Sequence, residues 1–367
     1  MKLSILQENL KNAVNLTSHF ISSKAQLPIL ANILIQADKT KLTLSATNLE
    51  NSITTLIAGK IEKEGEIAVN GKTLNEVVSN LSSGTVDLEV VKEQMKLTSP
   101  NLKLNILGTN TSDFPKLPKD IGKNPIILDR NEFIKSLSKI LFSVSLDETR
   151  PILTGVLFSF NKKSLTLVAT DGFRLSEINL KSKIESEDIN LIIPKSILNE
   201  IVRIEGEDEI KLSYDKNNNQ VIFKIGDTLL SSRVIEGEFP DYKKIIPKNI
   251  EGTLSVDKYE LDKVIKLASV FARDSGNMIK FKITGVKLTI SAESSVSGSQ
   301  ETELEARVEG SIKTEIMFNY RFLEEMIKVV EDDEIQIKTT GPNTASFFLD
   351  PMFSNFLHII MPIKSQG

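Results

Sequence analysis

Alternating and helical hydrophobic patterns recur along this chain in a fixed order. Residues 42–48 read LTLSATN, residues 165–171 read LTLVATD and residues 288–294 read LTISAES, so the phrase returns at intervals of 123 residues. Apolar and polar residues alternate in each copy, which predicts a half-buried strand. The chain therefore contains three copies of one unit, each long enough to form a domain with its own core.

Each copy also carries two helical patterns, in which apolar residues recur at three- and four-residue spacing. We expect helices over 4–24, 70–81, 129–146, 194–203, 257–273 and 319–330. Residues suited to a helix start stand at or before these patterns; they are Asn70, Asp129, Pro194, Ser255 or Asp257, and Asn319.

Further alternating segments predict the remaining strands of each copy. They include VDLEV (86–90), EIKLSY (209–214) and EIQIKT (334–339), while NKKS and DKNNNQ have the Asn and Asp content of hairpin tips. Two helices with many short strands indicate an α+β unit. Segments rich in Pro, Gly, Lys and Asn separate the copies, which predicts domains over 1–122, 123–249 and 250–367.

Composition narrows the class of protein. The 367 residues are 40% hydrophobic, yet no apolar run reaches 18 residues and the N-terminus lacks the apolar core of a signal peptide. We therefore expect no membrane association. Cysteine is absent, which excludes disulfides, thiolate zinc sites and cysteine nucleophiles and fits a cytoplasmic protein.

Charge is distributed unevenly between the predicted elements. The whole chain carries −4, but the six predicted helices carry +4 and the remainder −8. One reading is that lysine simply suits exposed helix faces. The other is a helix-lined surface that faces a polyanion, with basic side chains at Lys11, Lys24, Lys72, Lys135, Lys139, Lys195, Arg203, Lys263 and Lys266.

The sequence offers no convincing catalytic motif. NGKT at 70–73 resembles the end of a phosphate-binding loop, but Glu66 stands where that loop needs glycine and the other copies read IPKS and FNYR there. Ser136 and Lys139 form S-x-x-K without the companion motifs of acyl-transfer enzymes. We expect no catalytic residues and no cofactor.

Histidines and acidic runs do not indicate a metal site. Neither His19 nor His358 has a partner at metal-binding spacing. The acidic runs at 205–209 and 331–334 occupy matching places after the second helix of their copies, where turns are expected.

Repeat two departs from the common pattern. It reads VATDGFRLSEI over 168–178, where repeat one reads ATNLENSI and repeat three reads AESSVSGS. Asp171 and Gly172 predict a turn, and the extra features just past it are a basic residue, Arg174, with apolar residues Phe173 and Leu175 on either side. By itself, this stretch fits a packed loop as well as a site. The C-terminal LHIIMPIKSQG is also unusually apolar for a chain end, so we expect it to be docked.

At these residues the chain resembles the bacterial sliding clamp, the β subunit of DNA polymerase III, from end to end. The matching segments, in the family's order and spacing, are LPIL (27–30), TNLE (47–50), SDFPKL (112–117), RPILTG (150–155), VATDGFRL (168–175), GEFPDYKKIIP (237–247) and IIMPIK (359–364).

The resemblance implies a DNA-clamp fold of three pseudo-symmetric α+β repeats, each with two helices packed on antiparallel sheets. Two chains would meet head-to-tail as a homodimer, a six-domain ring with helices inside around double-stranded DNA. Such a ring holds DNA without reading sequence and needs no chemistry. The implied partners are the DNA polymerase III alpha subunit, the clamp loader, and other polymerases and repair proteins that carry a clamp-binding peptide.

The resemblance also implies site residues. The partner-peptide pocket corresponds to Leu153, Thr170, Gly172, Phe173, Arg174, Leu175, Pro240, Lys244, Ile245, Phe322, Ile359 and Met361. Lys24, Lys72, Lys195 and Arg203 align with basic DNA-contact positions, and the dimer interface corresponds to Leu104, Ile106, Val270 and Phe271. The family often has histidine in place of Phe173 and usually ends near Lys364, whereas this chain adds Ser365, Gln366 and Gly367.

Two other classes stay open on the sequence. One is an enzyme built on the repeat, with Gly71-Lys72 or Ser136-Lys139 as its site. The other is a triplicated structural or adhesion protein with no role on DNA, which the helix-biased basic charge disfavours.

Overall fold

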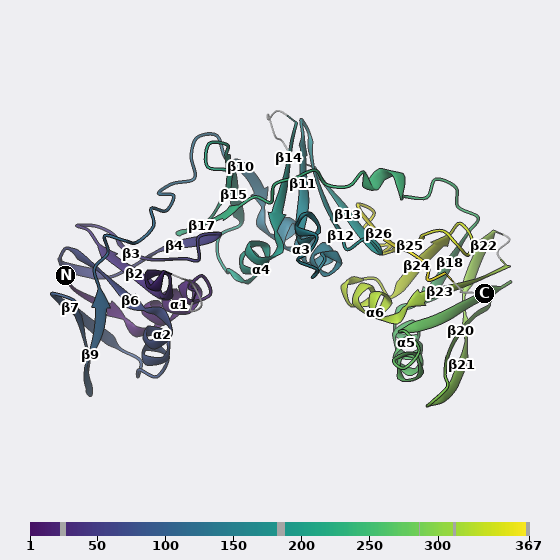
Figure 1. The fold of residues 1–367 in the computed structure, drawn as a ribbon, viewed down its shortest axis with the longest axis horizontal. Helices are drawn as coiled ribbons and strands as arrows, with labels where there is room; N and C mark the ends of the chain where they lie inside the picture. The colour runs from purple at the N-terminus through teal and green to yellow at the C-terminus, as the bar shows by residue number, and fades with distance from the viewer. Residues whose placement is uncertain (23–26, 182–187, 286, 311–312, 365–367) are drawn as a thin grey trace. The chain divides into compact units, whose positions relative to one another are not determined.

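The computed structural model describes residues 1–22, 27–181, 188–285, 287–310 and 313–364. The chain divides into two compact units, which are treated separately below (Figure 1). Unit 1 comprises residues 1–131 and 203–234, and unit 2 comprises residues 132–202 and 235–367.

Unit 1 is built on one sheet of 13 strands in the order β10-β15-β16-β17-β4-β3-β2-β6-β9-β8-β7-β1-β5. Its strands are β1 (Lys2–Leu6), β2 (Asn32–Ala37), β3 (Leu42–Thr47), β4 (Asn51–Ile57), β5 (Lys60–Lys63), β6 (Gly65–Asn70), β7 (Thr85–Val91), β8 (Gln94–Ser99), β9 (Leu102–Thr109), β10 (Ile126–Asp129), β15 (Glu209–Asp215), β16 (Gln220–Ile225) and β17 (Thr228–Arg233). Helices α1 (Gln7–Ser18) and α2 (Gly71–Ser79) pack against each other beside it, and η1 (Pro28–Ala31) precedes β2.

Unit 2 contains a nine-stranded sheet, β14-β11-β12-β13-β26-β25-β24-β18-β22, and a four-stranded sheet, β21-β20-β19-β23. The strands are β11 (Gly155–Asn161), β12 (Ser164–Thr170), β13 (Arg174–Lys181), β14 (Ile189–Pro194), β18 (Gly252–Asp257), β19 (Met278–Thr284), β20 (Lys287–Ser294), β21 (Gly298–Glu305), β22 (Arg307–Gly310), β23 (Lys313–Asn319), β24 (Glu334–Thr339), β25 (Ser346–Leu349) and β26 (Phe356–Ile360). The helices are α3 (Arg130–Ile140), η2 (Leu141–Ser143), η3 (Pro151–Thr154), α4 (Lys195–Arg203), η4 (Tyr242–Lys244), α5 (Lys258–Ala272) and α6 (Tyr320–Val329); α3 and α4 each begin or end at the unit boundary.

All six predicted helices are confirmed, with corrections at their ends. Residues 2–6 form β1, because Leu3 and Ile5 alternate with exposed neighbours and are buried as in a strand. Helix α3 ends at Ile140 and continues as the short η2. The caps at Asn70, Asp257 and Asn319 accept backbone N–H groups of Thr73, Glu260 and Arg321. Pro194 ends β14 instead of opening α4.

The sheets explain why the compact units do not follow the three sequence repeats. Strand β17 of repeat two pairs with β4 of repeat one, and Ser231 and Thr228 form side-chain hydrogen bonds to Ser52 and Thr55. Strand β13 of repeat two pairs in the same way with β26 of repeat three. Continuous hydrogen-bonded ladders therefore join neighbouring repeats, and the middle repeat is shared between the units.

An apolar core in unit 2 lies next to the turn between β12 and β13. Leu175 of β13 pairs with Ile359 of β26, and both are fully buried. They belong to an apolar cluster that also contains Phe347, and the linker after residue 234 packs onto it through Phe239 and Tyr242. The linker thus packs on the sheet residues that flank the turn after β12.

Candidate functional site

The turn between β12 and β13 is fixed by its own side chains. The Thr170 hydroxyl donates to the Arg174 carbonyl at 2.6 Å and accepts the Gly172 N–H at 3.1 Å. Asp171 Oδ1 accepts the N–H groups of Phe173 and Arg174 at 2.9 and 3.0 Å. Gly172 has a φ of +91°, which glycine adopts without strain. The turn therefore holds Phe173 and Arg174 in one defined geometry.

Repeat one contains the same turn without the same chemistry. Thr47 Oγ1 donates to the Asn51 carbonyl, and Asn48 accepts two backbone N–H groups as Asp171 does. However, Glu50 and Asn51 stand where repeat two has Phe173 and Arg174. The turn is a property of the repeat, whereas the aromatic and basic side chains are particular to repeat two.

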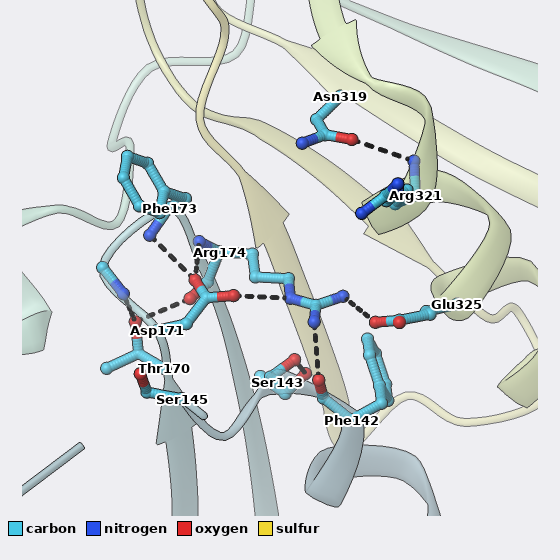
Figure 2. A network of polar contacts seen from close by, with 12 residues as sticks. Phe142, Ser143, Ser145, Thr170, Asp171, Phe173, Arg174, Asn319, Arg321 and Glu325 are labelled. Carbon is cyan, nitrogen blue, oxygen red and sulfur yellow. Dashed lines mark hydrogen bonds and ion pairs between the residues drawn. The ribbon is translucent and has the colours of Figure 1, made fainter. Parts of the chain in front are cut away.

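Arg174 is the centre of a buried polar network (Figure 2). Its Nε donates to Asp171 Oδ2 at 2.9 Å, and its Nη2 donates to the Phe142 carbonyl at 2.7 Å. Its Nη1 lies 2.5 Å from Glu325 Oε2. The guanidinium also lies 5.3 Å from the Phe142 ring centre and 4.5 Å from that of Phe322. Cation–π and charge-assisted contacts together compensate the burial of this cation.

The network joins repeats two and three. Phe173 is 62% exposed, and its ring is stacked on Phe322 of α6 with centres 6.5 Å apart. The Met361 N–H donates to the Phe173 carbonyl at 2.8 Å, and the Ile363 N–H donates to the Met317 carbonyl. Exposed apolar surface from Phe173 and Met361 therefore lies directly beside the Arg174 network. These contacts also show that the apolar C-terminal segment is docked.

Several expected pocket residues are buried supports. Leu175 and Ile359 are fully buried, while Leu153 and Thr170 are nearly so. Their side chains form the floor of the site and are not free to touch a ligand, because neighbouring core residues already cover them.

The linker supplies exposed residues next to the same core. Pro240, Lys244 and Ile245 are exposed, and Lys244 pairs with Asp241 at 3.0 Å. Tyr242 anchors this segment, and its hydroxyl donates a hydrogen bond to the Glu177 carboxylate. Burial and the neighbouring Glu177 carboxylate raise the Tyr242 pKa. Since Tyr242 packs on the cluster around Leu175, the linker lies against the floor of the site.

A second polar chain is buried behind Arg174. The Ser143 and Ser176 hydroxyls are 2.8 Å apart, and Ser176 is hydrogen-bonded to His358 Nδ1 at 2.8 Å. Burial, with the Arg174 charge nearby, lowers the His358 pKa to about 3. His358 is therefore neutral at physiological pH, and it packs against the Phe142 ring.

The residues expected on a basic surface differ in how far the structure exposes them. The exposed members are Lys11, Lys72, Lys135, Arg203, Lys263 and Lys266. Lys135 pairs with Glu331 and Lys266 with Asp262, so part of this charge is locally balanced. Lys195 is half-buried, and desolvation together with the Arg174 charge lowers its pKa despite the opposing effect of Glu325. Lys24 lies outside the described residues.

Lys139 was wrongly expected on that surface. Its side chain is only 2% exposed, with Nζ 2.8 Å from Asp350 Oδ2 and 2.7 Å from the Val329 carbonyl. Although burial alone raises the Asp350 pKa, hydrogen bonds from Lys139 and the Glu331 N–H outweigh it and leave that pKa lowered. Lys139 is thus a structural cation between α3 and the segment that follows β25.

The expected subunit-contact residues are unequally available. Val270 is exposed and Phe271 and Leu104 are half-buried, but Ile106 is buried within its own unit. Leu107, one residue further along β9, is 73% exposed and was missed by the sequence reasoning. Strand β9 pairs with β8 along its length but with β6 only at Gly108 and Thr109, which leaves the Leu102–Leu107 edge open.

Neither enzymatic alternative finds support at its residues. The Ser136 hydroxyl donates to the Glu132 carbonyl within α3, and Lys139 is held by Asp350. Gly71 is buried at the first position of α2. The Asn70 side chain caps this end of the helix by accepting the Thr73 N–H. Within the described ranges, no three His, Asp or Glu side chains are placed to hold a metal, and no helix is long and apolar enough to cross a membrane.

Three contributors to the site were not predicted. The Asp171 carboxylate and the Phe142 carbonyl accept from Arg174 Nε and Nη2, and Glu325 pairs with Nη1 (Figure 2). The i, i+3 spacing of Asp171 and Arg174 was a visible signal for one of them. The Phe142 carbonyl and Glu325 approach only through tertiary packing.

Comparisons with known proteins cover the whole chain. Residues 1–118, 127–241 and 243–364 match the N-terminal, central and C-terminal domain models of the DNA polymerase III beta subunit. The chain is 30% identical to the beta sliding clamp of Synechococcus elongatus, with 100% of both proteins covered.

Solved structures agree with this similarity. The DNA polymerase sliding clamp of Bacillus subtilis is 26% identical with a TM-score of 0.94, covering 100% of this chain and 99% of that one. The DNA polymerase III beta subunit of Thermotoga maritima is 25% identical with a TM-score of 0.92, covering 99% of each chain.

Proposed function

The chain belongs to the DNA polymerase III beta subunit family and is a non-catalytic DNA sliding clamp for polymerase processivity; from this premise we propose which of its surfaces hold DNA, a second copy and partner proteins. The three successive family matches and the threefold recurrence of the strand phrase support domains at 1–122, 123–249 and 250–367.

We propose that the exposed basic residues of the helices contact DNA phosphates. They are Lys11, Lys72, Lys135, Arg203, Lys263 and Lys266, with the half-buried Lys195 as a further contributor and Lys24 included on the family resemblance alone. Contacts of this kind are electrostatic and independent of base sequence, which suits a protein that must move along the duplex. We place this activity in the bacterial cytoplasm, where replicating DNA lies.

The closed ring requires a second copy of the chain. We propose a head-to-tail homodimer in which the open edge of β9, with Leu104 and Leu107, meets the α5 surface of Val270 and Phe271. Exposed apolar side chains on both surfaces support this pairing.

The observation that carries the partner site is the exposed apolar surface of Phe173 and Met361 beside the charged Arg174 network. Exposed apolar surface beside a small number of charged groups is suited to a short peptide. We propose that the polymerase alpha subunit, the clamp loader and other replication and repair proteins dock peptide segments here. Pro240, Lys244, Ile245 and Phe322 would border the peptide, and the buried Leu153, Thr170, Leu175 and Ile359 would support it from beneath.

Removing the C-terminal segment tests this site. Deletion of residues 361–367 removes Met361 and its backbone hydrogen bond to Phe173, so a fluorescent peptide from the partner polymerase should lose at least about tenfold in affinity. Deletion of residues 365–367 alone is the matched control and should leave the affinity unchanged. Equal peptide affinity of both truncated proteins would show that the site lies elsewhere.

A further inference from the structure

The guanidinium of Arg174 has fixed partners at Nε and Nη2 and a single carboxylate partner at Nη1. Nε and Nη2 are taken by Asp171 and the Phe142 carbonyl, and two aromatic rings lie within 5.3 Å. Nη1 meets Glu325, which reaches it from α6 of repeat three (Figure 2). Any anion that approaches Arg174 beside Phe173 and Met361 must therefore compete with Glu325.

The two carboxylates around Arg174 differ in how firmly they are held. The Asp171 side chain is 15% exposed and also accepts two backbone N–H groups of its own turn. The Glu325 side chain is 43% exposed. Partly exposed ion pairs contribute little net stability, because water solvates the released carboxylate well. Glu325 can therefore be exchanged, while Asp171 is part of the turn.

Cations dominate the surroundings of Glu325. The half-buried Lys195 of α4 lies close enough to Glu325 and Arg174 for both charges to affect its pKa. Arg321 precedes Glu325 by one helical turn. Removing the Glu325 carboxylate from Nη1 would leave a net positive position beside exposed apolar surface. That combination suits a peptide carboxylate adjacent to apolar side chains.

We propose that Glu325 is a built-in competitor that occupies the anion position of Arg174 in the free clamp and is displaced by an aspartate or glutamate of an incoming peptide. The inference rests on the proposed function of this surface as the partner-peptide site. One carboxylate replaces another at Nη1, so this nitrogen keeps an anionic partner while Asp171 stays on Nε. Glu325 thereby lowers the affinity for acidic peptides and keeps their binding reversible, which lets partners exchange on one site.

The test uses two amidated, fluorescein-labelled hexapeptides of leucine and phenylalanine that differ at one position, Asp in one and Asn in the other. Fluorescence anisotropy measures their affinities for the full-length wild-type protein and for Glu325→Gln. We expect Glu325→Gln to bind the Asp peptide about fivefold more tightly, as expected for the loss of a partly exposed competing ion pair, with less than about twofold change for the Asn peptide.

Two further variants separate this local competition from general effects. Glu324→Gln makes the same change of charge on the same helix at the neighbouring position, and it should leave both affinities unchanged. In Arg174→Gln, the additional Glu325→Gln substitution should no longer favour the Asp peptide, because the contested cation is gone. Thermal melting checks that each variant is folded.

Three results would overturn the proposal. They are an equal effect of Glu325→Gln on both peptides, an equal gain from Glu324→Gln, and no binding of either peptide to Glu325→Gln. If the Asp and Asn peptides respond equally but lose binding on deletion of residues 361–367, the competitor is refuted and the partner site stands. If both peptides bind undiminished to that truncated protein, the proposed partner site itself is refuted.

Discussion

Buried polar residues decide much of the behaviour of unit 2. Arg174, Lys139 and His358 are all buried, yet each is held differently: by carboxylates and rings, by an ion pair, and by a chain of hydroxyls. Burial penalises charge unless a partner compensates it. The two cations have such partners, whereas His358 faces another cation and is kept neutral.

His358 should make the stability of unit 2 depend on pH. Its pKa is lowered from 6.5 to about 3 in the fold, so the neutral form is favoured there. The resulting stability is fully present above pH 6.5 and is lost as the pH falls from 6.5 toward 3, by up to about 1.4 kcal/mol per pH unit. His358→Gln keeps a polar partner for Ser176 but cannot take up a proton.

Urea unfolding of the wild type and His358→Gln at pH 7.5 and pH 5 measures this effect. The wild type should lose more of its free energy of unfolding between these values than the variant does. Every other ionisable group is common to both proteins, so the comparison isolates His358. A difference between the proteins that is the same at both pH values would contradict the assignment.

Lys139 and Lys135 provide a matched pair on α3. Lys139→Met leaves the buried Asp350 carboxylate without its cation and should lower the free energy of unfolding by about 3–5 kcal/mol. Lys135→Met removes an exposed partner of Glu331 and should cost less than about 1 kcal/mol. Chemical denaturation compares them; similar losses would mean that the Lys139–Asp350 pair is not the buried contact described.

At the scale of elements, local pattern predicted what local forces determine. The helices at 70–81 and 319–330 were visible because a cap residue and an apolar stripe agree, and both caps are present in the structure. The start of the chain was misjudged because a five-residue strand, Lys2–Leu6, runs directly into α1 and its apolar residues also fit a helical spacing.

At the candidate site, local pattern predicts the turn but not the contacts between distant segments. The T-D-G turn was readable because Thr170, Asp171 and Gly172 determine it through their own hydrogen bonds. The burial of Lys139 and the approach of Glu325 depend on Asp350 and Arg174, which lie 211 and 151 residues away in sequence. No local pattern encodes such pairings, because the fold alone brings these segments together.

The proposed dimer contact can be tested on helix α5. Phe271→Asp would place a carboxylate in an apolar interface and should weaken the dimer by about 3 kcal/mol or more, roughly a hundredfold. Light scattering after size exclusion should show the wild type at twice 40.8 kDa and the variant at 40.8 kDa. Tyr259→Asp, an exposed residue of the same helix outside the proposed contact, should remain dimeric. A dimeric Phe271→Asp would place the interface elsewhere.

At the scale of the whole molecule, the proposed function gives the threefold repeat a mechanical role. A sliding clamp must hold DNA without sequence contacts and without chemistry, so its repeats need only present basic surface to the duplex and close a ring around it. Specificity is then expected where the repeats differ. Arg174 and Phe173 of repeat two and the C-terminal segment of repeat three are such differences, and they meet at one site.

The most direct test of this account is retention on circular and linear DNA. The protein, loaded by its clamp loader onto nicked circular DNA, is washed at high salt, which screens phosphate contacts. The protein should stay on the circles and be lost rapidly once they are linearised, because a closed ring can leave only over an end. Equal rates of loss from circular and linear DNA would contradict topological retention.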